Sequence, residues 1–125
     1  MSGTTLDTGA LIALESGSRR MIALIETAMR ARSPIAVPAG VLAQAWRYGA
    51  RQARIARLLR SSITELVALD RSEALSVGRL CARTGAADVI DVSVIVCARR
   101  RKHQVITGDP DDLAAIDPTL RLLAP

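Results

Sequence analysis

The stretch TTLDTGALIALE, residues 4–15, decides the fold. Residues 4–6 are β-prone, and from Thr8 onward Leu11, Ile12 and Leu14 recur as the inward face of a helix. The stretch therefore predicts a short strand followed at once by a helix. Asp7 lies at the carboxyl end of that strand, and Thr8 is the predicted cap of the helix.

The rest of the chain repeats this alternation. Strands are expected at residues 35–37, 64–69, 104–107 and 120–123, and helices at 19–31, from 39 onward to about 60 with a break near 48–49, at 72–83, at 88–101 and after 109. Ser72 is the expected cap of the helix over 72–83. Alternating strands and helices predict a three-layer α/β/α sandwich with a short, mostly parallel central sheet. At 125 residues, with no repeat or linker, we expect one domain over 1–125.

The composition is that of a globular, basic protein. Hydrophobic residues make up 50% and charged residues 23%, the net charge is +5, and Lys102 is the only lysine. Arginine suits phosphate because its planar fork donates two hydrogen bonds. A basic chain with acids inside it favours a polyanionic substrate that is reached through a cation. A plain bias toward arginine is the alternative.

Several residue classes point away from other functions. No apolar run approaches the roughly 18 residues of a membrane span, and residues 1–20 lack the features of a secretory leader, so we expect the protein in the cytoplasm. Cys81 and Cys97 lie in apolar helical segments and are expected to be buried, reduced thiols. His103 has no partner at ligand spacing and is expected at the surface.

Four aspartates lie at the edges of predicted elements. Asp7 and Asp109 follow strands, and the carboxyl ends of parallel strands share one rim where ligands bind. Asp88 and Asp91 share one face at the start of the most apolar helix. Carboxylates brought together raise one another's pKa unless a cation neutralises them, and oxygen ligands suit Mg²⁺ or Mn²⁺. Asp112 is close enough in sequence to join.

Each acid also has a structural reading. Asp109 and Asp88 could be ordinary helix caps, and Asp7 could cap the helix that Thr8 begins. Asp91 is harder to explain in this way, because its helix face continues into the core. We therefore expect it to point inward, where a buried acid needs a partner.

Four segments, in this order, resemble the PIN domains and more narrowly the VapC-like ribonuclease toxins of type II toxin–antitoxin systems. They are LDTGAL at residues 6–11, VLAQAWR at 41–47, ADVID at 87–91 with Ala98 seven positions on, and TGDPDDL at 107–113. The resemblance implies a PIN-like fold. It further implies a Mg²⁺- or Mn²⁺-dependent endoribonuclease that leaves a 5′-phosphate, with RNA and a cognate antitoxin as partners and a homodimer as its assembly. The antitoxin's C-terminal segment would cover the groove of the site.

By the same resemblance Asp7, Asp91 and Asp109 are metal ligands, and Asp88 completes the catalytic set. Gln44 stands where such proteins commonly have a glutamate, so it and Asp112 are expected outside the ligand shell. An amide can coordinate through its oxygen, but it adds no charge and accepts no proton. A PIN-like module that binds RNA or an antitoxin and cuts weakly or not at all is therefore the alternative function. A phosphoacceptor receiver domain fits poorly, since it needs adjacent acids after the first strand.

Basic and aromatic residues supply the expected substrate contacts. Arg47, Arg51 and Arg54 are predicted to share one helix face and hold the RNA backbone, as could residues 99–102. A solvated face and contact with an acidic partner are the alternatives. Trp46 and Tyr48 are expected to be core or interface anchors, because two aromatics are too few for a base-stacking platform.

Overall fold

The structure, a computed structural model, describes residues 3–47 and 49–125. In chain order the elements are β1 (Thr4–Leu6), α1 (Thr8–Glu15), α2 (Arg19–Ala31), β2 (Ile35–Pro38), α3 (Ala39–Ala45), the 3-10 turn η1 (Gly49–Arg51), α4 (Ala53–Arg60), β3 (Thr64–Val67), α5 (Arg71–Thr84), α6 (Val89–Arg101), β4 (Gln104–Ile106), α7 (Pro110–Ile116) and β5 (Leu122–Leu123). All the predicted strands and helices are present, and the differences lie at their ends.

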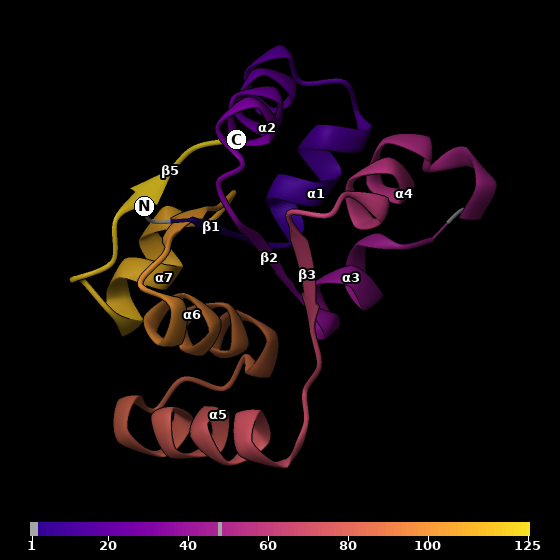
Figure 1. The fold of residues 1–125 in the computed structure, drawn as a ribbon. Helices are drawn as coiled ribbons and strands as arrows, with labels where there is room; N and C mark the ends of the chain where they lie inside the picture. The colour runs from indigo at the N-terminus through magenta and orange to yellow at the C-terminus, as the bar shows by residue number, and fades with distance from the viewer. Residues whose placement is uncertain (1–2, 48) are drawn as a thin grey trace.

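The five strands form one parallel sheet in the order β3-β2-β1-β4-β5. Helices α1, α3 and α4 lie on one side of it and α6 on the other, with α5 packed outside α6 (Figure 1). This is the predicted three-layer α/β/α sandwich. Among the described residues, no helix is long and apolar enough to cross a membrane.

The core is aliphatic and centres on α6. Every residue of this helix from Val92 to Ala98 is buried, because α6 contacts the sheet on one side and α5 on the other. Both cysteines are free thiols, as expected; Cys97 is fully buried, but Cys81 is only half-buried, contrary to its prediction. Ile12 differs from its prediction: its side chain is 52% exposed, because α1 turns only Ala10, Leu11 and Leu14 fully inward.

Two helices begin one or two residues earlier than predicted, and both are capped by aspartate. Asp70, rather than Ser72, caps α5 by accepting a hydrogen bond from the Glu73 N–H at 2.9 Å. Asp7, rather than Thr8, caps α1. The carboxylate offers two acceptor oxygens to the free N–H groups of the first turn and also complements the helix dipole.

The strand order makes the end of β1 the topological switch point of the sheet. From β1 the chain moves to β2 on one side, and it returns to β4 on the other side only after α5 and α6. Ligands bind at such a switch point, outside the carboxyl ends of the strands. Asp7 follows β1, and Asp109 follows β4 by three residues.

Candidate active site

Asp7 is buried and held rigidly at this switch point. Its carboxylate, 4% exposed, accepts hydrogen bonds from the Ala10 N–H at 2.9 Å and from the Gly108 N–H at 3.2 Å. Burial raises the pKa of Asp7, and hydrogen bonds from Thr107, Ala10 and Gly108 offset part of that rise. The cap and the candidate ligand are thus one side chain, oriented by β1, α1 and the loop after β4.

Two glycines allow the loops after β1 and β4 to meet. A Cβ on Gly9 would lie 2.9 Å from the Gly108 Cα, closer than real Cβ atoms come to backbone. This contact brings the Gly108 N–H to Asp7. We did not predict this role for Gly9, Thr107 or Gly108, although the TGD sequence directly after a strand is a signal that could have revealed it.

Asp88 and Asp91 stand at the start of α6. Asp88 is the N-cap, as one of its two readings predicted, and accepts from the Ile90 and Asp91 N–H groups at 3.0 Å each. Asp91 is only half-buried, so it points inward less completely than expected, and the buried run begins at Val92. Burial, followed by the negative charges of Asp88, Asp109, Asp112 and Asp7, raises the pKa of Asp91 to about 6.

Asp109 and Asp112 complete this rim, and both are exposed. Asp109 precedes Pro110 at the N-cap position of α7, but its side chain makes no capping hydrogen bond, so the capping alternative is not realised. Its backbone N–H instead donates to the Thr107 Oγ1 at 2.8 Å. The negative charges of both acids raise the pKa of Asp91, so all the acids that the sequence singled out lie within electrostatic reach of Asp91.

Gln44 lies beside the same rim. Its side chain is exposed near the end of α3. Its carboxamide Oε1 accepts a hydrogen bond of 2.5 Å from the Oγ1 of Thr8, the residue that follows Asp7. The middle segment of the sequence therefore reaches the candidate site. A neutral amide occupies a place where a further carboxylate would increase the repulsion on its neighbours.

The donor set suits a hard divalent cation in chemistry and in charge, since it consists of carboxylate oxygens that repel one another. The geometry is open: among the described residues, no three His, Cys, Asp or Glu side chains lie close enough together to hold one ion. Binding an ion would require the exposed side chain of Asp109 and the half-buried side chain of Asp91 to rotate toward the fixed carboxylate of Asp7.

The three arginines predicted to share a helix face do not share one. Arg47 follows α3, Arg51 belongs to η1 and Arg54 to α4, because the helical pattern breaks between residues 46 and 52. The Arg47 guanidinium donates to the Ala43 carbonyl at 2.6 Å. Arg54 contacts Glu15, donating to its carbonyl at 3.2 Å and lying 3.9 Å from its carboxylate. Arg51 is exposed.

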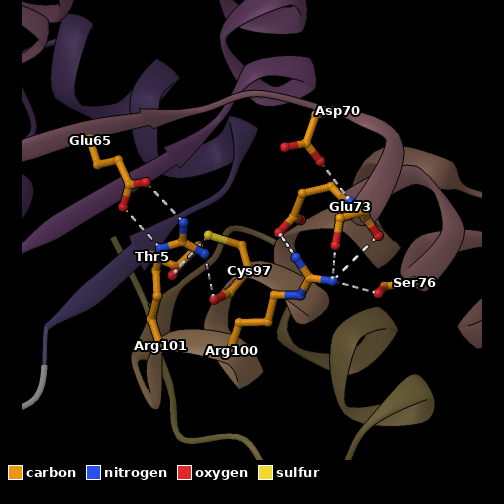
Figure 2. Close-up of polar contacts among 9 residues, drawn as sticks. Thr5, Glu65, Asp70, Glu73, Ser76, Cys97, Arg100 and Arg101 are labelled. Carbon is orange, nitrogen blue, oxygen red and sulfur yellow. Dashed lines mark hydrogen bonds and ion pairs between the residues drawn. The ribbon is translucent and has the colours of Figure 1, made fainter.

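The arginines at the end of α6 are structural, contrary to the proposed RNA contact of residues 99–102. Arg99 pairs with Asp117 at 2.7 Å, Arg100 with Glu73 at 2.7 Å, and Arg101 with Glu65 at 3.0 Å. Figure 2 shows Arg100 and Arg101 pointing to different acids, one on α5 and one on β3. Lys102 ends the helix in the left-handed conformation.

Two further expectations need correction. His103 is half-buried rather than at the surface, with its Nδ1 3.1 Å from the buried Thr5 Oγ1, and burial together with the nearby Arg101 lowers its pKa. Trp46 is 37% exposed and so is not a core anchor. Tyr48 lies outside the described residues.

Comparisons with known proteins agree with this architecture. The PIN domain family model matches residues 4–117. Among solved structures, VapC20 of Mycobacterium tuberculosis, a sarcin-ricin loop cleaving toxin, is similar with a TM-score of 0.66 and 19% identity, covering 90% of this chain and 95% of that one. A search of curated proteins found no match.

Two similar structures are toxin–antitoxin complexes on DNA. VapBC2 of Rickettsia felis, bound to a fragment of its promoter, has a TM-score of 0.71 at 17% identity over 97% of both chains. DNA-bound VapBC of Salmonella typhimurium has a TM-score of 0.70 at 18% identity, covering 99% of this chain and 98% of that one. At these identities the likeness establishes the fold.

Proposed function

Because this chain belongs to the PIN domain family, we propose that it is a metal-dependent endoribonuclease and the toxin of a toxin–antitoxin pair, acting in the cytoplasm as one PIN domain over residues 1–125. One observation carries the proposal: at the switch point of the sheet Asp91 is partly buried among four other carboxylates from three separate segments, and burial together with their charges raises its pKa. Carboxylates gathered in this way repel one another and destabilise the folded state, and a bound cation would remove that repulsion.

The roles of the acids follow from how each is held. Asp7, fixed by the cap of α1 and by Gly108, is the rigid ligand, and Asp91 and Asp109 are the ligands that move toward it. Mg²⁺ or Mn²⁺ bound there would activate water and stabilise the charge on the attacked phosphate. Asp88 and Asp112, whose charges act on Asp91, would orient the water or take its proton, and Gln44 accepts a hydrogen bond from Thr8.

The proposed partner is an antitoxin, since toxin–antitoxin complexes are among the similar structures. A hollow of about 180 Å³ among α1, α2 and α4 offers its C-terminal segment an apolar seat, lined by Leu14, Ile22, Ile25, Met29 and Leu58 together with Glu26, Arg54 and Arg57. A segment bound there would lie against α1, the helix that Asp7 caps. The homodimer and the RNA contacts of Arg47, Arg51 and Arg54 stay predictions.

A catalytically silent module is the competing proposal, and Gln44 is the feature that favours it. Two measurements on the purified chain separate the functions: cleavage of several unrelated RNAs with and without Mg²⁺ or Mn²⁺, and calorimetric titration with Mn²⁺. We expect metal-dependent cleavage that Asp7→Asn abolishes. Asp111→Asn is the matched control, because Asp111 is an exposed acid of α7 that does not act on Asp91.

Cleavage without metal, or full activity of Asp7→Asn, would refute the metal site. Bound Mn²⁺ without cleavage of any RNA would favour the silent module. Gln44→Glu then shows whether charge is what is missing: the glutamate keeps an acceptor for Thr8 and adds a carboxylate, so we expect tighter Mn²⁺ binding and, in a weak enzyme, faster cleavage.

A further inference from the structure

A second hollow has a lining that differs from the acidic rim. It encloses about 380 Å³ between the end of α3 and α4, and its described lining contains an indole and two arginines but no acid. The residues that line it are Trp46, Gly49, Gln52, Ala53, Ala56, Arg57 and Arg60. A volume of this size is within the range of small-ligand sites.

The arginines of this hollow are available to a ligand. Within the part of the chain that the structure describes, Arg57 and Arg60 make no hydrogen bond or ion pair, and both are exposed. Their neighbour Arg54 on the same helix is engaged with Glu15. Since residues three apart on a helix are neighbours, the two guanidinium groups can reach adjacent anionic groups of one ligand.

The indole is held in place by its backbone rather than by burial. The backbone N–H of Trp46 donates to the Leu42 carbonyl at 2.8 Å. On either side of Trp46, the buried Gln52 side chain donates to the Ala45 carbonyl at 2.6 Å and accepts from the Arg47 N–H at 2.8 Å. The most hydrophobic large side chain of the region is thus presented at the surface on a fixed segment.

The hollow is linked to the candidate site through α3. Trp46 comes two residues after Gln44, whose side chain accepts a hydrogen bond from Thr8, the neighbour of Asp7 in the chain. An aromatic face combined with free arginines is the combination that binds unpaired nucleotides, in which bases stack and phosphates pair.

We propose that this hollow binds one unpaired nucleotide of the RNA substrate, with its base stacked on Trp46 and its phosphates paired with Arg57 and Arg60. The inference rests on the proposed function and adds a preference for single-stranded over paired RNA. An acidic peptide would satisfy the arginines but would leave the indole face uncovered, so the lining favours a nucleotide.

Trp46 is the only tryptophan of the chain, so its own fluorescence reports on the hollow. We would titrate the full-length protein in EDTA, where no cleavage occurs, with a single-stranded mixed-sequence RNA, the same RNA as a duplex, and an abasic strand of equal length. We expect the single strand to quench Trp46 and to bind about 10-fold or more tightly than the abasic strand, as loss of one stacked base predicts.

Variants test the residues separately, with anisotropy of a labelled RNA as the readout and thermal melting as the check on folding. Trp46→Ala should weaken binding about 10-fold and Trp46→Phe should restore most of it. Arg57→Ala and Arg60→Ala should each weaken binding and lower its salt dependence. Arg19→Ala, which removes an exposed arginine of α2 far from the hollow in sequence, should bind as the unchanged protein does.

Equal quenching by single strand, duplex and abasic strand would overturn the inference, as would unchanged RNA affinity of Trp46→Ala, or quenching only by an acidic peptide. Failure of the proposed function gives a different result. Binding in EDTA needs neither metal nor Asp7, so an inactive protein and Asp7→Asn should both keep the quenching. Metal-dependent cleavage without quenching would reject this inference alone.

Discussion

The two ends of α6 carry opposite charges, and only the charges at its basic end are paired with counterions. At its start, burial and the charges of four other carboxylates raise the pKa of Asp91 to about 6. At its end, three consecutive arginines each find a different acid, Asp117, Glu73 or Glu65. Both charge placements suit the helix dipole. Only the acidic end leaves its charges without counterions, and unresolved electrostatic conflict of this kind is found where a protein binds or reacts.

The largest expected effect comes from breaking the acidic end. Asp91→Asn removes a proposed metal ligand. Mutating even the residues that only support the ligands of a metal site lowers metal affinity or activity about 10- to 100-fold, so we expect activity to fall by more than about 100-fold here. The same change relieves repulsion, so in EDTA at pH 7 the variant should be more stable. Allowing for solvent screening, we expect a gain of about 1 to 2 kcal/mol in the free energy of unfolding.

RNA cleavage and chemical denaturation measure these two quantities on the same samples. Mn²⁺ should raise the melting temperature of the unchanged protein more than that of Asp91→Asn. Lower stability of the variant in EDTA would show that the acids at this rim are structurally satisfied, and the contrast between the two ends of α6 would disappear.

At the basic end, Glu73→Ala should have the next largest effect, and on stability alone. Glu73 is buried at 6% exposure and bonds the partly exposed Arg100, so its loss removes a buried pair. Breaking fully buried pairs costs about 3 to 5 kcal/mol, and we expect about 2 kcal/mol here because Arg100 is reached by water. Urea denaturation measures the loss, with Glu26→Ala on exposed α2 as the control.

The two ends should also respond to pH with opposite signs. Asp91 binds protons more tightly in the folded state, so its contribution is lost as pH rises from 3.8 to about 6. The pKa of Glu65 is lowered, chiefly by its hydrogen bond from Arg101, so its contribution is lost as pH falls below 4.5. The pKa of Asp117 is also lowered: burial raises it, but hydrogen bonds from Thr119 and Arg99 lower it by more. The contribution of Asp117 to stability is therefore also lost as the pH falls.

Melting temperatures of the metal-free protein between pH 3 and 7 test this contrast. We expect the unchanged protein to lose stability from pH 4 to 6 relative to Asp91→Asn, because only the unchanged protein carries the titrating carboxyl. Parallel curves for the two proteins would contradict the raised pKa of Asp91.

The smallest effect is expected at the pair of Arg101 with Glu65. Glu65 is 59% exposed, so Glu65→Gln should cost less than about 1 kcal/mol, and salt should screen the difference. Denaturation at low and high ionic strength measures it. A loss as large as that of Glu73→Ala would mean that burial does not decide which of these pairs matters.

Local patterns were enough for the fold and for much of the site. Apolar periodicity located every strand and helix, and the strand-end rule brought Asp7 and Asp109 to one rim. The cap of α1 was missed, because Thr8 and Asp7 both suit the position and only the tertiary contact with Gly108 distinguishes them.

The arginines could not be interpreted in the same way. The partners of Arg99, Arg100 and Arg101 lie between 18 and 36 residues away, and nothing in the local sequence names them. The shared face expected of Arg47, Arg51 and Arg54 failed because Gln52 bonds the end of α3 and breaks the helix. Ion pairs with residues distant in the sequence, rather than residue type, decide which arginine side chains remain unpaired.

The pairing of β1 with β4 has a consequence for when the site can exist. Thr4 lies opposite Gln104 and Leu6 opposite Ile106, so Asp7 and Asp109 meet only after nearly the whole chain has been made. Contacts this distant in sequence form late in folding. A chain still leaving the ribosome has its first three strands available, but the rim that carries Asp7 and Asp109 is complete only when synthesis is almost finished.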